Sequence, residues 1–162
     1  MQIVYNKYFS TQLPELEEIS KWTVFTRFNL STPLHLFSIR DRDEIVAYAL
    51  ITEHSTGGVP VLESRVQVPG FQYLLDYLEV RLSHRKCGLA TELLSKISRE
   101  FRGEPIVLET MPDTTAFFLK LGAKYIREPV ENAVNVMVLN LKSIDELSRD
   151  TRKRFYKWNK LT

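Results

Sequence analysis

The 162-residue chain has a single cysteine, Cys87, and its three histidines do not have metal-ligand spacing. An intrachain disulfide and a cysteine-based metal cluster are therefore excluded, and we expect no metal site. No apolar run approaches the ~20 residues that span a bilayer, and no secretory signal is evident. The net charge of +2 is too small to indicate nucleic acid or an acidic surface as the main partner. These absences predict a soluble, cytoplasmic protein without a metal.

The composition is typical of one globular domain. With 44% hydrophobic residues, a chain of this length can bury a sizeable core, and no repeat, low-complexity tract or linker divides it. We expect a single domain over residues 1–162. Residues 143–162 are predicted to form an amphipathic, basic C-terminal helix, which opens with a capping box at Ser143–Glu146.

The most informative stretch is Leu74–Phe101. Its first part, Leu74–Leu82, is apolar and β-prone, as in a buried strand. From Gly88 onward apolar residues recur every four positions, which predicts an amphipathic helix. A strand that runs through a tight turn into a helix leaves main-chain N–H groups unpaired at the positive end of the helix dipole. Because Gly88 and Ala90 remove side-chain bulk there, the turn is predicted to bind phosphate, above all pyrophosphate.

The turn is neither a P-loop nor a GxGxxG dinucleotide motif. Its residues Arg85–Ala90, Arg-Lys-Cys-Gly-Leu-Ala, instead resemble the Arg/Gln-x-x-Gly-x-Gly/Ala motif of the GNAT N-acetyltransferase superfamily. Val80, five residues upstream, matches the apolar end of that family's fourth strand. Ala116–Ala123 is similar to the family's later A-L-Y-x-K-L-G-F element. The resemblance is specific over Leu74–Tyr125.

The rest of the chain agrees with the fold that this resemblance implies. We expect an α/β fold with a mixed, mostly antiparallel central sheet, splayed between its fourth and fifth strands and flanked by helices. Residues 59–72 are either an extra strand pair or a long loop. A helix is predicted to follow Ser10 or Thr11, and another to be capped by Asp113. The strands are predicted at residues 2–9, 34–40, 45–53, 74–82, 106–110, 125–128 and 134–141.

The resemblance also implies where an acyl-CoA would bind. In the GNAT fold the acyl-pantetheine arm lies between the splayed strands, hydrogen-bonded to the main chain, and the turn wraps the pyrophosphate. By position, the Leu78 N–H is the candidate donor to the oxyanion. The implied acetyl-CoA contacts are Val80, Leu82, Arg85, Lys86, Cys87, Gly88, Leu89, Ala90, Thr91 and Phe118.

Acidic residues on the central strands are the natural general bases for an amine acceptor. We rank Asp76 first, then Glu79, then Glu53. The two-residue period of a strand places Asp76 on the face of Leu78 and Val80, and Glu79 on the other face unless a bulge intervenes. Each of the three is also compatible with an ordinary solvated or ion-paired strand residue.

One departure from the family pattern concerns the acid that protonates the thiolate. Where many members have a tyrosine, this chain has Phe118, and a phenyl ring cannot donate a proton. Tyr73, Tyr77 and Tyr125 are alternative donors. His35 and His54 have the positions of strand-surface residues.

Our leading hypothesis is an N-acetyltransferase that uses acetyl-CoA and a primary amine. One alternative is a catalytically weak acyl-CoA-binding regulator that has lost the acid. Another is a module that binds nucleic acid or an acidic partner through the basic face over Arg149–Lys160, although a solvated helix face is the preferred reading there. Exposed strand edges make a homodimer plausible.

Overall fold

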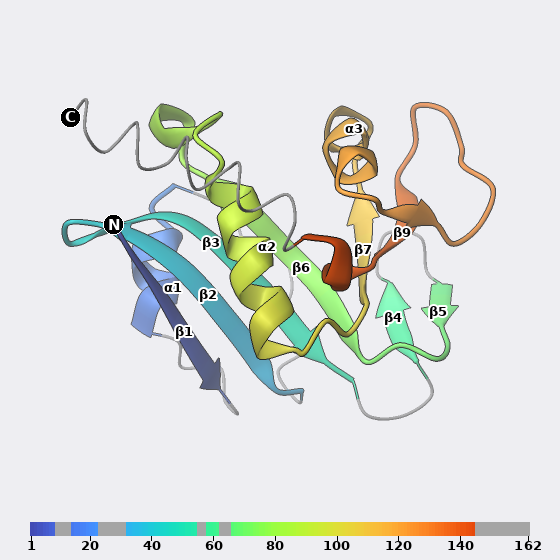
Figure 1. Cartoon of the computed structure of the whole chain (residues 1–162), viewed down its shortest axis with the longest axis horizontal. Coiled ribbons are helices and arrows are strands. Elements are labelled where there is room, and N and C mark those ends of the chain that lie inside the picture. Colours follow the sequence, from blue (N-terminus) through green and yellow to red (C-terminus); the bar gives the residue numbers. More distant parts are fainter. Residues whose placement is uncertain (9–13, 23–31, 55–57, 62–65, 145–162) are drawn as a thin grey trace.

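The computed structural model describes residues 1–8, 14–22, 32–54, 58–61 and 66–144. Its centre is a seven-stranded sheet with the strand order β1-β2-β3-β6-β7-β9-β8 (Figure 1). Among the described strand pairs of this sheet, β6–β7 is parallel and the others are antiparallel. The strands are β1 (Gln2–Tyr8), β2 (Leu34–Asp41), β3 (Glu44–Glu53), β6 (Tyr73–Val80), β7 (Ile106–Thr110), β8 (Lys124–Tyr125) and β9 (Asn135–Leu139).

Helices cover both faces of this sheet. Helix α2 (Leu89–Glu100) lies across one face, and α1 (Pro14–Ile19) lies behind the other (Figure 1). The apolar stripe of α2 is buried against inward-facing strand residues such as Phe37, Ala49 and Leu108. On the α1 face, Ile19 packs with Tyr48 and other strand residues. These two cores hold the sheet from both sides. None of the described helices is both long and apolar enough to cross a membrane.

A two-stranded sheet of β4 (Val59–Val61) and β5 (Val66–Val68) extends the α1 face. Val59, Val61 and Val68 pack there against Leu74 and Val107 of the central strands. Of the two predictions for residues 59–72, the extra strand pair is therefore correct. Helix α3 (Pro112–Lys120) and the 3-10 turns η1 (Leu82–His84) and η2 (Leu141–Ser143) complete the described part of the chain.

The predicted fold class is confirmed, with local corrections. The N-cap of α3 is Met111, and Asp113 lies inside the first turn, so the predicted cap is wrong. The penultimate strand is shorter than predicted, at Lys124–Tyr125. The predicted caps Ser10 and Thr11 and the basic C-terminal helix beyond Ile144 lie outside the described residues.

Candidate active site

The sheet opens between β6 and β7. Within the described residues the two strands pair only at Tyr73↔Ile106, Leu74↔Val107 and Leu75↔Leu108. Beyond Leu75, β6 continues to Val80 along β3 but away from β7. The last five residues of β6 therefore face a gap where a parallel partner would otherwise lie. This is the splay that the family resemblance implies.

The turn that follows β6 contains main-chain N–H groups without a main-chain acceptor among the described residues. Lys86 and Gly88 have positive φ angles of 63° and 82°, and Gly88 is the N-cap of α2. The first main-chain bond of the helix runs from the Glu92 N–H to the Gly88 carbonyl at 3.0 Å. Among the described residues, the N–H groups over 86–91 have no main-chain acceptor. Such a run of unpaired donors at a helix N-terminus attracts an anion.

The side chains of the turn divide into inner and outer ones. Leu89 is buried at 1% exposure in the α2-face core, so only its main chain is available to a ligand. Cys87 is half-buried, and its Sγ donates to the Arg85 carbonyl at 3.5 Å. Arg85 is exposed, and its Nε donates to the Val80 carbonyl at 3.0 Å. Thus Arg85 bridges the end of the strand and the turn.

Leu82 lies elsewhere than predicted. It belongs to the 3-10 turn η1, not to the strand, and it is 80% exposed. The strand pairing ends where the Arg81 N–H donates to the Val46 carbonyl at 2.8 Å. The predicted strand position of Leu82 is therefore wrong, whereas Val80 remains in β6.

A β-bulge at Asp76 decides which way the acidic residues point. Leu50 pairs with Tyr77 and Ile51 pairs with Leu75, so Asp76 is an extra residue without a partner on β3. Leu78 and Val80 pack against the α2-face core. Asp76 instead bonds to Thr52, whose partner Leu74 packs on the α1 face. The prediction that Asp76 shares the face of Leu78 and Val80 is therefore wrong.

The environment of Asp76 favours its neutral form. Burial raises the pKa of Asp76 to about 7, and the nearby charge of Glu109 on β7 adds to this. The Thr52 hydroxyl opposes the shift, because it donates to Asp76 Oδ2 at 2.9 Å. Asp76 is thus a carboxyl group that changes its charge near neutral pH, as a general base should.

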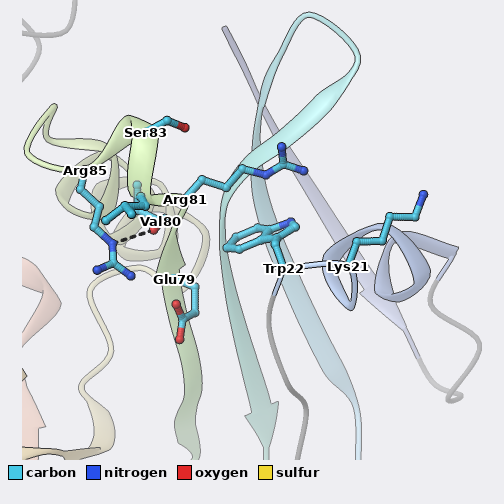
Figure 2. Close-up of a pocket in the computed structure, with 8 residues that line it drawn as sticks. Lys21, Trp22, Glu79, Val80, Arg81, Ser83 and Arg85 are labelled. Carbon is cyan, nitrogen blue, oxygen red and sulfur yellow. Dashed lines mark hydrogen bonds between the residues drawn. The ribbon is translucent and has the colours of Figure 1, made fainter.

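Glu79 lines a cavity of about 680 Å³ at the end of β6. Figure 2 shows Arg81 reaching over the ring of Trp22, with Glu79 beside them and Arg85 folded back to Val80. The Arg81 guanidinium lies 5.4 Å from the Trp22 ring centroid. Burial raises the pKa of Glu79, and the charge of Arg85 partly opposes the shift. The cavity combines an aromatic wall, cations and one carboxylate.

Glu53, the third predicted base, lies at the opposite end of β6, where it pairs with Tyr73. Its carboxylate accepts from Lys7 Nζ at 2.9 Å and lies 2.8 Å from His35 Nε2. Although burial acts to raise it, the hydrogen bonds from Lys7 and His35 hold the pKa of Glu53 below its usual value. Glu53 therefore does not lie beside the opening between β6 and β7. His35, expected at the surface, is buried at 3% exposure.

Phe118, which stands where the resemblance implies a tyrosine acid, is also buried. Phe118 on α3 is 6% exposed and packs with Phe117 and the α2-face core. Of the alternative donors, Tyr73 stacks on Phe101 at the closed end of β6, with ring centroids 4.2 Å apart. Tyr77 lies in the splayed part of β6 on the α1 face, beside Tyr48. By position, Tyr77 is the better placed of these two.

Sequence reasoning did not connect three polar residues with Asp76: Thr52, His54 and Glu109. Thr52 belongs to β3, three elements earlier in the chain than β6, and His54 directly follows β3, whereas Glu109 belongs to the neighbouring strand β7. No local pattern indicates that Thr52 bonds to Asp76, that His54 bonds to Thr52, or that the charge of Glu109 lies near, since all three depend on strand register. No cluster of metal-ligating side chains occurs among the described residues.

The architecture and the turn define a class of protein: a splayed-sheet fold with a pyrophosphate-type turn, as in acyl-CoA-dependent transferases. Comparison with family models agrees, because the model described as "Acetyltransferase (GNAT) family" matches residues 2–123. The chain belongs to the GNAT acetyltransferase family. A comparison with curated proteins found no match.

Solved structures share the fold at low sequence identity. *Escherichia coli* ElaA superposes with a TM-score of 0.61 at 14% identity, covering 85% of this chain and 99% of that chain. *Bacillus subtilis* YlbP, an N-acetyltransferase in complex with coenzyme A, has a TM-score of 0.57 at 15% identity, covering 86% and 97%. The ribosomal-protein-S18-alanine N-acetyltransferase of *E. coli* has a TM-score of 0.53 at 16% identity, covering 86% and 94%.

Proposed function

We propose that this protein transfers an acetyl group from acetyl-CoA to a primary amine by direct attack of the amine on the thioester. The observation that carries the proposal is the opening between β6 and β7, which begins at Asp76 and ends at the donor-rich turn before α2. An extended acyl-pantetheine fits such an opening, and its pyrophosphate would lie on the N–H groups over 86–91.

In this proposal the turn binds the donor mainly through its main chain. The N–H groups of Gly88, Ala90 and Thr91 bind phosphate oxygens, and Arg85 and Lys86 add charge from the rim. The Val80 carbonyl now accepts from Arg85 Nε. Arg85 is exposed, so it can turn outward to the pyrophosphate and release this carbonyl to the pantetheine.

The chemistry needs a neutral amine, a stabilised oxyanion and a protonated leaving group. We assign proton removal to Asp76, because a group whose pKa is about 7 can accept a proton at physiological pH. Glu79, on the cavity wall, holds the incoming ammonium group. The Leu78 N–H donates to the oxyanion, a contact worth about 10²–10³ in rate in enzymes where it was tested.

Tyr77 is the proposed acid for the CoA thiolate. It lies in the splayed part of β6, whereas Phe118 offers no proton. Tyr77→Phe should therefore lower kcat with little effect on the affinity for acetyl-CoA. Equal kcat in the variant would mean that the thiolate takes its proton from water.

The experiment is a screen of amines for acetyl-CoA-dependent CoA release. The panel includes small amines, amino acids, a lysine peptide and a peptide with an N-terminal alanine, the residue type named for the *E. coli* neighbour. Product CoA is followed by chromatography, because Cys87 would add background to a thiol reagent. Turnover that is lost in Asp76→Asn but kept in Glu53→Gln supports the assignment.

One observation favours a second candidate, an acyl-CoA-binding regulator with little activity: the expected tyrosine is replaced by a buried phenylalanine. This candidate predicts tight acetyl-CoA binding without CoA release for every amine in the panel. Release above the no-enzyme rate with any acceptor would exclude it. The proposal of a nucleic-acid or acidic partner rests on residues outside the described part of the chain.

A further inference from the structure

Asp76 is one end of a chain of three hydrogen-bonded side chains. The Thr52 hydroxyl donates to Asp76 Oδ2 at 2.9 Å, and Thr52 Oγ1 lies 3.0 Å from His54 Nε2. Because the single hydroxyl proton of Thr52 is directed to Asp76, its oxygen accepts from His54 Nε2–H. The chain therefore has a defined polarity, from the imidazole to the carboxylate.

The strand framework fixes this chain in place. Thr52 is 2% exposed and pairs with Leu74 across the β3–β6 ladder. The main-chain N–H of His54 donates to the Gln72 carbonyl at 2.7 Å. The three side chains lead from the beginning of the splay to the closed end of β6, beside the apolar packing of β4 and β5. His54, at the far end, is half-buried.

The proposed reaction must release a proton. An ammonium acceptor forms a C–N bond as the C–S bond of the thioester breaks, and its nitrogen loses two protons on the way to the amide. One of them ends on the CoA thiol. The other must leave the site in every turnover, and a partly buried carboxylate that keeps it cannot act again.

We propose that Thr52 and His54 are positioning residues that carry this proton from Asp76 to solvent. The proposal rests on the proposed role of Asp76 as the base. When Asp76 holds the proton, its O–H donates to Thr52 Oγ1, and the Thr52 hydroxyl turns to the unprotonated Nε2 of His54. A concerted shift of two protons then restores the carboxylate and leaves an imidazolium, which is the polarity seen in the structure. Exchange of the ring protons with water returns the neutral Nδ1–H form for the next turnover.

The charges around the three hydrogen-bonded side chains favour release of the proton from His54 to solvent. Burial lowers the pKa of His54, so the imidazolium gives its proton to water readily. The charge of Glu109 on β7 raises the pKa of Asp76, and the hydrogen bond from Thr52 on β3 lowers it. The described residues of β4 and β5 that pack nearby are valines. Glu79 lies on the same strand as Asp76, three residues further along.

The first test is a titration of the free protein by NMR, with the Asp76 carboxyl carbon and the His54 ring as probes. In Thr52→Val the pKa of Asp76 should rise, because the donated hydroxyl bond that favours the carboxylate is lost. In Asp76→Asn the pKa of His54 should fall, because the attracting negative charge is gone. In the Thr52→Val background the same Asp76→Asn change should move His54 clearly less.

The matched control is Thr110→Val, which removes a buried strand hydroxyl that bonds to Thr115 and not to Asp76. It should leave the titration of Asp76 unchanged. If Thr52→Val does not fold, the response of His54 to Asp76→Asn decides alone. The proposal would be overturned if Asp76→Asn left the pKa of His54 unchanged. It would also be overturned if Asp76→Asn shifted that pKa equally with and without the Thr52 hydroxyl.

The second test is the pH profile of CoA release with an acceptor found in the amine screen. Thr52→Val should lower kcat about tenfold below neutral pH, less than the ~10²–10⁴ that a base itself contributes. The loss should fade at alkaline pH, where hydroxide removes the proton directly, and Thr52→Ser should restore the rate. A loss that is uniform with pH would indicate a merely structural role and overturn the relay. If no acceptor turns over, the proposed function fails, and the titration still decides whether the three groups exchange protons as one chain.

Discussion

The two ends of β6 carry carboxylates in opposite electrostatic situations. At the closed end, Glu53 is held by Lys7 Nζ at 2.9 Å and His35 Nε2 at 2.8 Å, and its pKa lies below the usual value despite burial. At the splayed end, burial raises the pKa of Asp76 to about 7 and also raises the pKa of Glu79. The surroundings thus favour the charged form of a carboxyl group at the closed end and its neutral form at the splayed end.

This contrast distinguishes Glu53, whose charge is balanced by hydrogen-bonded partners, from Asp76, which we propose to be the general base. A carboxylate whose pKa is lowered by its partners contributes to folding stability at neutral pH, whereas a carboxylate whose pKa is raised by burial reduces it. Carboxylates of the second kind occur frequently at functional sites. The sequence alone ranks the three candidate bases with little difference between them. The hydrogen-bond partners and burial of each side chain, which depend on the fold, distinguish them clearly.

The largest expected effect is on donor binding at the splayed end. Gly88→Glu places negative charge and bulk where phosphate is proposed to bind, and should weaken CoA binding at least ~100-fold, measured by calorimetry. Because Gly88 has a φ of 82°, Gly88→Ala serves as the control for backbone strain. Gln2→Glu, on the exposed edge strand β1, controls for added charge. Unchanged affinity in a folded Gly88→Glu protein would remove the turn from the site.

The next effect is on rate. Asp76→Asn should lower kcat by ~10²–10⁴ while leaving acetyl-CoA affinity intact, because it removes only the base. Glu53→Gln should keep kcat within about threefold, since Glu53 lies at the closed end. Steady-state CoA release for the two variants measures the contrast. A larger loss of kcat for Glu53→Gln than for Asp76→Asn would reverse our assignment.

The same two variants should rank in the opposite order for stability at neutral pH, with Glu53→Gln the more damaging. Glu53→Gln should lower the free energy of unfolding by about 1–2 kcal/mol, because it removes the acceptor charge for Lys7 and buried His35. As pH falls through the lowered pKa of Glu53, the wild type should lose this advantage. Urea unfolding at neutral and acidic pH measures it. Equal stability of the variant and the wild type at neutral pH would contradict the account of the closed end.

The remaining expected effect is a gain in stability. Since the pKa of Asp76 is raised from 3.8 to about 7, the unfolded chain loses its proton first, and stability falls as pH rises through 7. Asp76→Asn removes this loss, so the variant should be more stable than the wild type above neutral pH, by on the order of 1–3 kcal/mol. Below pH ~4 the difference should vanish. A variant that is less stable at alkaline pH would show that Asp76 is a compensated structural charge.

Much of this arrangement is predictable because it is local. The strand, turn and helix over Leu74–Phe101 follow from apolar periodicity and from the glycine at the helix start, and the structure has them at nearly the predicted bounds. The splay follows from the family resemblance. Strand β3 and its hairpin with β2 were equally readable from two β-prone runs around a polar turn.

The errors on Asp76 and His35 occur where a contact depends on residues that are distant in the sequence. A strict two-residue period places Asp76 with Leu78, but the bulge adds one residue and turns Asp76 to the other face. The burial of His35 depends on Phe101, more than sixty residues away, whose ring lies 4.9 Å from it. The contact between Thr52 and Asp76 has the same origin, so no local sequence pattern could have indicated it.

The most direct test of the central claim is calorimetric titration of the purified protein with acetyl-CoA, with free CoA alongside. The account predicts micromolar binding of both ligands, because the turn recognises the pyrophosphate that they share. Absence of binding in a protein shown to be folded would contradict the claim that the β6–β7 opening is an acyl-CoA site.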